Sequence, residues 1–321
     1  MLIRANFPVL ATAVLFGTAT SLRADIGAEI RTATVVAADA EIGTAIVLVA
    51  SSEIGTAIAM AEEAVARGEY LIHAGGCVTC HTMEGDNARL FAGGRPLESP
   101  FGTFYSPNIT PDTETGIGGW TDDDFVRAFW EGVSPRGEHY FPAFPYTAYT
   151  GVRADDLLAM KAYLFSREAV AQSNREHDLS FPASSRLAAA AWKSRYFEPG
   201  RFQPDPEKTE QWNRGAYLVR HLGHCGECHT PRTRFGALQD SHELQGNPDG
   251  PGGETVPNIT ADPEDGIGDW SLRDIEYFLD IGMLPDGDFT GGAMAEVIED
   301  STSPLTEDDR LAIATYLKSL H

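Results

Sequence analysis

The chain has 321 residues, enough for two small domains with separate apolar cores, and its apolar fraction of 42% is ordinary for a globular protein. Its formal net charge is −23, which predicts no nucleic-acid partner because phosphate binding requires clustered Lys and Arg. The acidic charge favours either solubility alone or a partner that docks through a basic patch.

The N-terminus resembles a secretion signal. Arg4 supplies a positive charge, the run from Phe7 to Phe16 is apolar, and small residues follow up to Ala24. The run is too short for a typical spanning helix, so we expect a signal peptide over residues 1–24, with an uncleaved anchor as the alternative. The mature protein would then lie in the periplasm, and an association with the outer face of the cytoplasmic membrane stays open.

Residues 25–61 contain a 12-residue repeat of small and apolar residues. The hexapeptide Glu-Ile-Gly-Thr-Ala-Ile occurs at 41–46 and again at 53–58. The stretch 42–61 is nearly apolar but contains Glu53, whose charge would be costly in lipid. We predict a low-complexity linker or a loosely docked helix, with a second membrane anchor as the alternative.

All four cysteines fall in two copies of one pattern, Cys77-Val-Thr-Cys80-His81 and Cys225-Gly-Glu-Cys228-His229. CxxCH is the attachment pattern of c-type haem, in which two thiols bond one edge of the porphyrin and the histidine ligates the iron. The sequence therefore predicts two covalently bound haem c groups, with His81 and His229 as proximal ligands.

Two other uses of paired cysteines fit less well. A redox-active Cys-x-x-Cys pair is typical of a βαβ pattern, which is absent from this sequence. A structural zinc site would need the two pairs much closer together along the chain.

The chain repeats itself around the two cysteine motifs. The recurring segments are Arg67–Leu71 with Arg214–Leu218, Pro107–Thr110 with Pro257–Thr260, and Gly116–Trp120 with Gly266–Trp270. We therefore predict a first domain over residues 62–165, a connector over 166–210 and a second domain over 211–321.

The expected secondary structure is all-α, with helices joined by long loops around the haem. Thr121 with Asp124 and Ser271 with Asp274 resemble helix-capping pairs, and Thr306 is a further N-cap candidate. No segment alternates convincingly like a strand. Gly68 and Gly215 are expected to let the first helix of each domain approach the last, near Tyr163 and Tyr316.

The halves resemble class I cytochrome c domains. The runs Arg214–Val219, His224–Arg232 and Tyr140–Tyr146 resemble the multihaem cytochrome c subunits of periplasmic alcohol and aldehyde dehydrogenases. The resemblance covers about residues 65–321, including the aromatic connector around Phe181, Trp192 and Tyr196. It implies two tandem cytochrome c-like domains, although those subunits commonly carry three haems and this chain has two motifs.

In the resembled cytochromes, the loop before the last helix supplies a methionine on the distal side of the iron. Aligning Pro135–Gly137 with Pro285–Gly287 places Met294 opposite Phe144. Met294 is thus the predicted distal ligand of the second haem, with Met283 as the alternative. Phe144 cannot ligate iron, so His139 is the predicted ligand of the first haem; a surface histidine beside a vacant iron position is the alternative.

Four further side chains are candidate hydrogen-bond donors to the haem propionates. They are the amides of Asn108 and Asn258 and the indoles of Trp120 and Trp270. A purely structural role in the loops and core is the alternative.

The function predicted from these features is electron transfer. A dehydrogenase subunit would reduce one haem, and an oxidase or another cytochrome would take the electron from the other. The alternative is a dihaem enzyme, peroxidase-like or thiosulfate dehydrogenase-like, with an open or unusually ligated first haem. Haem-based sensing is less favoured because no output domain is attached.

Overall fold

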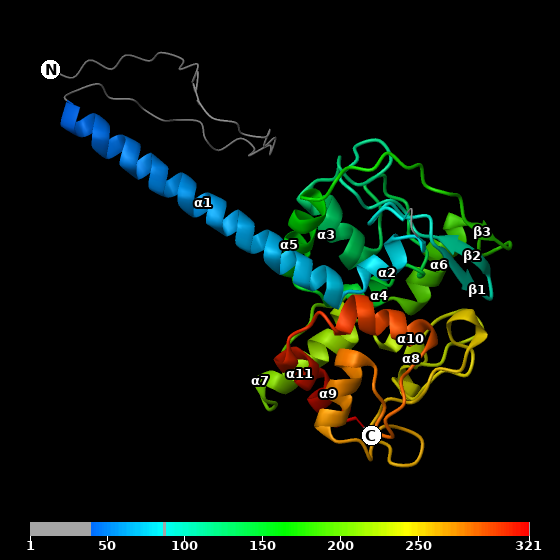
Figure 1. Cartoon of the computed structure of the whole chain (residues 1–321). Coiled ribbons are helices and arrows are strands. Elements are labelled where there is room, and N and C mark those ends of the chain that lie inside the picture. Colours follow the sequence, from blue (N-terminus) through cyan, green and yellow to red (C-terminus); the bar gives the residue numbers. More distant parts are fainter. Residues whose placement is uncertain (1–39, 86–87, 321) are drawn as a thin grey trace. The chain divides into compact units, whose positions relative to one another are not determined.

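In the computed structural model, which describes residues 40–85 and 88–320, most of the regular structure is helical (Figure 1). The α-helices are α1 (Ala40–Ala74), α2 (Cys77–His81), α3 (Asp122–Glu131), α4 (Tyr146–Tyr149), α5 (Ala154–Phe165), α6 (Arg186–Tyr196), α7 (Glu210–Tyr217), α8 (Gly226–His229), α9 (Leu272–Ile281), α10 (Gly292–Val297) and α11 (Glu307–Leu317). Two π-helical turns, Leu218–Leu222 and Ile298–Thr302, follow α7 and α10 directly. None of the described helices is both long and apolar enough to cross a membrane.

The N-terminal region is described only in part. The predicted signal peptide and residues 25–39 of the predicted linker lie outside the described residues. Residues 40–61 are helical and belong to α1. From residue 55 onward the chain packs as one compact unit.

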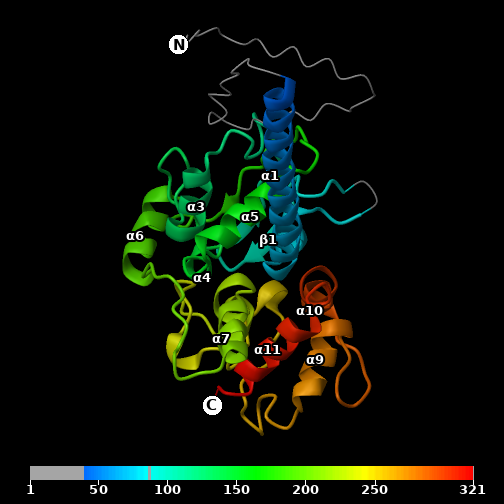
Figure 2. The same cartoon turned by 90° about the vertical axis from the view of Figure 1, so that its left-hand side faces the viewer.

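Within this unit, the elements of the first half (residues 62–165) and of the second half (residues 211–321) gather in two groups (Figures 1 and 2). The buried apolar side chains nevertheless form one continuous cluster, to which both halves contribute. Leu71, Tyr149 and Leu157 come from the first half, and Tyr217, Leu222 and Tyr316 come from the second. The two halves therefore share a core.

The predicted helix starts are confirmed. Thr121 caps α3 and Ser271 caps α9, and each forms a full capping box with the aspartate three residues later. Thr306 caps α11 by accepting a hydrogen bond from the Asp309 N–H. Aspartate replaces the usual glutamate in both boxes, and it still reaches back to the N-cap N–H.

Gly68 and Gly215 have the predicted packing role. A Cβ atom on Gly68 would overlap the Ala159 carbonyl of α5 and lie 2.8 Å from Tyr163 Cβ. A Cβ on Gly215 would overlap the Ala312 carbonyl of α11 in the same way. Glycine thus permits α1 to pack closely on α5, and α7 on α11.

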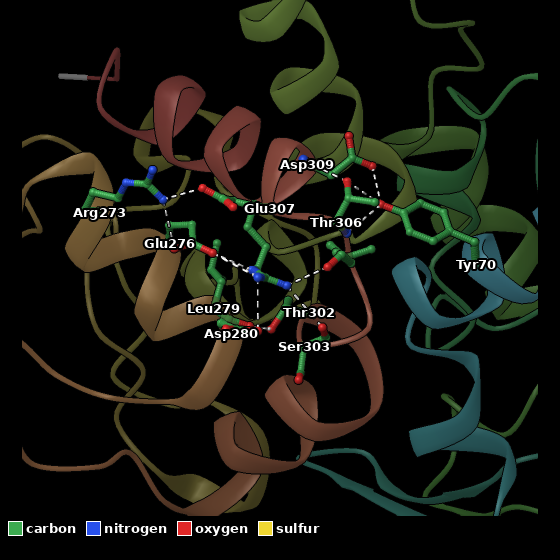
Figure 3. Close-up of polar contacts among 12 residues, drawn as sticks. Tyr70, Arg273, Glu276, Leu279, Asp280, Thr302, Ser303, Thr306, Glu307 and Asp309 are labelled. Atoms are coloured by element: carbon green, nitrogen blue, oxygen red, sulfur yellow. Dashed lines mark hydrogen bonds and ion pairs between the residues drawn. The ribbon is translucent and has the colours of Figure 1, made fainter.

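Each half donates one tyrosine hydrogen bond to an aspartate of the other half. Tyr70 of the first half donates to Asp309 at 2.6 Å, at the start of α11 (Figure 3). Tyr217 of the second half donates to Asp156 of α5, also at 2.6 Å. Each aspartate is in addition paired with the arginine of its own half, Arg67 or Arg214. The contact between the halves is therefore reciprocal.

A small sheet departs from the all-α expectation. Strands β1 (Pro96–Ser99), β2 (Gly102–Tyr105) and β3 (Asp178–Leu179) pair antiparallel in the order β1-β2-β3. The strands are too short to show an alternating pattern in the sequence. Because β3 belongs to the connector (residues 166–210), the sheet binds the connector to the loop that follows α2.

The glycine contacts predict a measurable cost of adding one methyl group. Gly215→Ala should lower the free energy of unfolding by about 1–3 kcal/mol, because the Cβ atom must displace a backbone carbonyl. Thermal unfolding of the holoprotein measures this change.

The matched control is Gly55→Ala in α1, where the added Cβ would have no atom of another described segment within 4 Å. This change should be neutral or stabilising, because alanine favours helix. Equal stability of the Gly215→Ala and Gly55→Ala proteins would contradict the packing role.

Candidate haem-attachment sites

Two short helical turns carry the cysteine motifs. The first haem motif, Cys77–His81, forms α2. In the second haem motif, Cys225–His229, the first cysteine is the N-cap residue and the other four residues form α8. The four thiols are not bonded to one another. A helical turn places the two cysteines of a motif on neighbouring positions of one face, as attachment to a single porphyrin edge requires.

Each motif histidine is held by a proline carbonyl. The distance from Nδ1 to the carbonyl oxygen is 2.8 Å both for His81 with Pro107 and for His229 with Pro257. Because a carbonyl only accepts, Nδ1 carries the hydrogen and Nε2 is left with its lone pair. Burial also lowers the pKa of both imidazoles and favours their neutral form, which is the form that ligates iron. The donor set therefore fits haem c.

The thiols do not resemble redox-active cysteines. Burial raises the pKa of Cys77 and of Cys225 to about 12 and that of Cys228 to about 11, whereas a reactive thiolate needs a lowered pKa. The described residues also contain no cluster of three or more His, Cys, Asp or Glu that could hold a metal ion. The raised thiol pKa values favour thioether attachment over redox-active dithiol chemistry.

The loops after the two motifs close in the same way. The carbonyls of His81 and His229 each accept a 2.8 Å hydrogen bond, from the N–H of Gly93 and of Gly246. The Pro-Asn-Ile-Thr repeat is visible in the sequence, but the role of its proline carbonyl was not predicted. The signal was available, since the repeat follows each CxxCH at almost the same separation.

Each haem motif also contacts the opposite half. Thr79 of the first motif donates to Asp300 at 3.0 Å, and Glu227 of the second motif accepts from Thr147 of α4 at 3.1 Å. Gly75 and His224, which lie just before the two motifs in the chain, also contact each other, with His224 Nε2 3.3 Å from the Gly75 carbonyl oxygen. The two motifs thus lie near each other inside the compact unit.

The four candidate propionate donors differ in their surroundings. The Asn108 amide donates to the connector carbonyl of Val170 at 2.7 Å, and also to Gln172 and Thr115. It is 2% exposed, so its hydrogens are used by the protein, and we favour the structural role for this residue. Within the described part of the chain, the Asn258 amide nitrogen and the Trp120 and Trp270 indole nitrogens have no such partner. They stay candidates.

The distal candidates lie in corresponding segments of the two halves, between α3 and α5 in the first and between α9 and α11 in the second. Met294 is half-buried in α10. Phe144 packs edge-on against Phe129, with ring centroids 5.2 Å apart, and belongs to the surroundings of the shared core. His139 lies beside the connector, with Nδ1 3.4 Å from Lys193 Nζ. In the first half the aromatic ring of Phe144 therefore faces the core, and the predicted histidine ligand faces α6.

Several known proteins are similar to this chain, although no protein-family profile matches it. A dihaem c-type cytochrome of Cereibacter sphaeroides is 42% identical over 261 residues, which cover 79% of this chain and 84% of that protein. The cytochrome c subunit of gluconate 2-dehydrogenase from Pantoea cypripedii is 43% identical over 80% of this chain and 59% of the subunit. The fructose dehydrogenase cytochrome subunit of Gluconobacter japonicus is 38% identical over 80% and 52%. The chain spans just over half the length of these two dehydrogenase subunits.

The similarity to the Cereibacter cytochrome extends over most of both chains, at an identity that establishes common descent. It agrees with two CxxCH turns whose histidines and loops have the same hydrogen bonds. The chain therefore belongs to the family of dihaem c-type cytochromes, and it carries two covalently bound haem c groups.

Proposed function

We propose that this cytochrome accepts electrons from a periplasmic dehydrogenase subunit and passes them to an oxidase or another cytochrome. The observation that carries the proposal is that each haem motif contacts the opposite half within one compact unit, Thr79 through Asp300 and Glu227 through Thr147. A chain with two neighbouring one-electron centres is suited to relaying electrons. The names of the dehydrogenase relatives support the choice of donor.

The proposed site assignment follows the sequence. Thioether bonds would form at Cys77, Cys80, Cys225 and Cys228, and His81 and His229 would be proximal ligands. The haems would supply reversible one-electron chemistry, and the surrounding residues would set potential through ligation and burial. We further propose that the first domain spans 62–165 and the second 211–321, each a cytochrome c-like domain.

The partner and the location form part of the same proposal. The net charge of −23 suits a partner with a basic docking patch. Haem attachment to CxxCH in the resembled cytochromes takes place outside the bacterial cytoplasm, which supports a periplasmic location. Association with the outer face of the cytoplasmic membrane would come through a partner subunit or the N-terminal region.

A second function is favoured by one observation, the presence of Phe144 where the second half has Met294. A first haem without a distal ligand would be open to small molecules. The chain would then be a peroxidase-like or thiosulfate dehydrogenase-like enzyme. Turnover of hydrogen peroxide or thiosulfate by the purified protein would support this alternative against simple electron transfer.

The electron-transfer proposal predicts reduction by a substrate-driven dehydrogenase. The oxidised holoprotein is added to periplasmic extract of the native cell supplied with gluconate or fructose, and the reduced haem absorbance is followed. We expect reduction whose initial rate falls as ionic strength rises, because salt screens the attraction between the acidic surface and a basic patch.

Heat-treated extract is the control for chemical reduction. Substrate-dependent reduction that does not change with salt would contradict the basic docking patch. No reduction with either substrate, in extract that oxidises both, would contradict these dehydrogenases as donors.

The distal residues predict two unequal haems. Ligation of the second haem by Met294 favours reduced iron, whereas the first haem has no sulfur ligand at Phe144. The first haem should therefore titrate at the lower potential, and only the second should give the weak near-infrared sulfur-to-iron band. Met294→Ala should abolish that band, and the control Met283→Ala should retain it.

Carbon monoxide tests the first haem. If His139 ligates, the native protein resists carbon monoxide and His139→Ala binds it; this requires the His139 ring to leave Lys193. Ready binding by the native protein would contradict the His139 assignment and favour the enzymatic alternative. Two sulfur-ligated haems would contradict the alignment of Met294 with Phe144.

A further inference from the structure

One backbone carbonyl joins the two haem motifs. The Gly75 carbonyl, just before the first motif, accepts a hydrogen bond from the Tyr149 hydroxyl at 3.1 Å. His224, just before the second motif, reaches the same oxygen with Nε2 at 3.3 Å. The rings of Tyr149 and His224 meet edge to face, with centroids 5.3 Å apart and an interplanar angle of 84°. Tyr149, His224 and Gly75, which we call the inter-motif bridge, therefore connect the two attachment turns.

His224 holds an unfavourable backbone conformation in order to reach this position. Its φ angle is +39°, in the left-handed region that favours glycine. The corresponding residue before the first motif is Gly76, with φ +60°. A histidine where the other half has glycine persists only if its contacts offset the strain.

A one-residue insertion precedes His224. Cys77 follows Arg67 by ten positions, whereas Cys225 follows Arg214 by eleven. In the first half this segment is regular helix to Ala74, and in the second half it contains the π-helical turn Leu218–Leu222. A π-helical turn is the usual way in which a helix accommodates one extra residue, and such turns are frequent at functional sites.

The inserted turn also contacts the first half. His221 lies with Nδ1 3.0 Å from the Ala148 carbonyl, and its ring fills the space beside Gly151 that a side chain would occupy. The insertion therefore brings two histidines, His221 and His224, onto α4 and the residues around it. This feature of the second half has no counterpart in the first.

We propose that Tyr149 and His224 are positioning residues, which hold the two haem-attachment turns against each other and so set the rate of electron exchange between the haems. In the exchange, one haem iron loses an electron and the other gains it, and no bond or proton is transferred. Electron tunnelling weakens steeply with separation, so loosening the bridge would slow it. The proposal rests on two redox-active haems but not on the identity of the external donor.

A purely structural role would have a different signature. The halves are also joined by the hydrogen bond from Tyr217 to Asp156, which involves neither Gly75 nor a cysteine. Tyr217→Phe therefore removes a buried hydroxyl bond from the same interface without touching the inter-motif bridge. It is the matched control for Tyr149→Phe.

The test measures electron equilibration within the full-length holoprotein. A light-activated reductant delivers one electron per molecule, and absorbance changes at wavelengths that distinguish the two haems report the exchange. Tyr149→Phe and His224→Gly should each slow the exchange several-fold, and Tyr217→Phe should leave it unchanged. The magnetic interaction between the two ferric haems, measured by electron paramagnetic resonance, should weaken in the same two variants only.

His224→Gly separates positioning from stability. Glycine removes the strain at φ +39°, so the thermal midpoint should fall less than in His224→Ala, while the exchange slows in both. Native exchange rates in Tyr149→Phe and His224→Gly would overturn the proposal. Equal slowing in Tyr217→Phe would show that the interface as a whole, and not the bridge, sets the rate. Either result would leave the dehydrogenase assay unaffected, and failure of that assay would leave this test intact.

Discussion

The hydrogen bond from each motif imidazole to a proline carbonyl is the constraint on which both halves depend. The bond fixes the hydrogen on Nδ1, which leaves Nε2 as the only nitrogen able to ligate iron. It also ties the loop that contains Pro107 or Pro257 to the attachment turn. The glycine N–H groups of Gly93 and Gly246 bind the carbonyls of the same two histidines. Loops with little regular structure are thereby ordered by bonds to the motif that they surround.

The contact between the halves also repeats one arrangement, in which an aspartate binds a tyrosine of the other half and an arginine of its own. Duplicated units that exchange equivalent contacts resemble the two subunits of a symmetric dimer, with the interface formed inside one chain. Burial acts to raise the pKa of Asp309, but the bonds from Arg214 and Tyr70 outweigh it and hold the pKa below its ordinary value. Asp309 therefore stays charged at neutral pH. Its stabilising contribution is present above the ordinary aspartate pKa and is lost as the pH falls through the lowered value.

The sequence was most informative where a single residue type has a single physical use. The capping boxes at Thr121 and Ser271 could be predicted because few other residues accept a hydrogen bond from a helix N-terminus. Gly68 and Gly215 were predictable because helices pack that closely only where the side chain is absent. Repetition in the two halves strengthened each of these interpretations.

Features that depend on distant partners could not be predicted in the same way. The strands β1, β2 and β3 involve too few residues for a pattern, and β3 comes from the connector. The Asn108 amide could donate a hydrogen bond to a haem propionate, yet in the structure it donates to the connector carbonyl of Val170. The inserted residue before Cys225 is visible in the sequence, but only the structure shows that it is accommodated in the π-helical turn Leu218–Leu222.

The two halves have diverged at the positions that would make the haems unequal. The scaffold contacts, from the motif histidines to the helix-packing glycines, are the same in both halves. The distal position changes from Phe144 to Met294, and the position before the motif changes from Gly76 to His224. Two identical haems would provide no driving force between them. With the proposed sulfur ligand, the second haem has the higher potential, and an electron that enters at the first haem moves toward the second. The differences thus lie in the residues that would set direction and rate, and the shared residues maintain the fold that carries both.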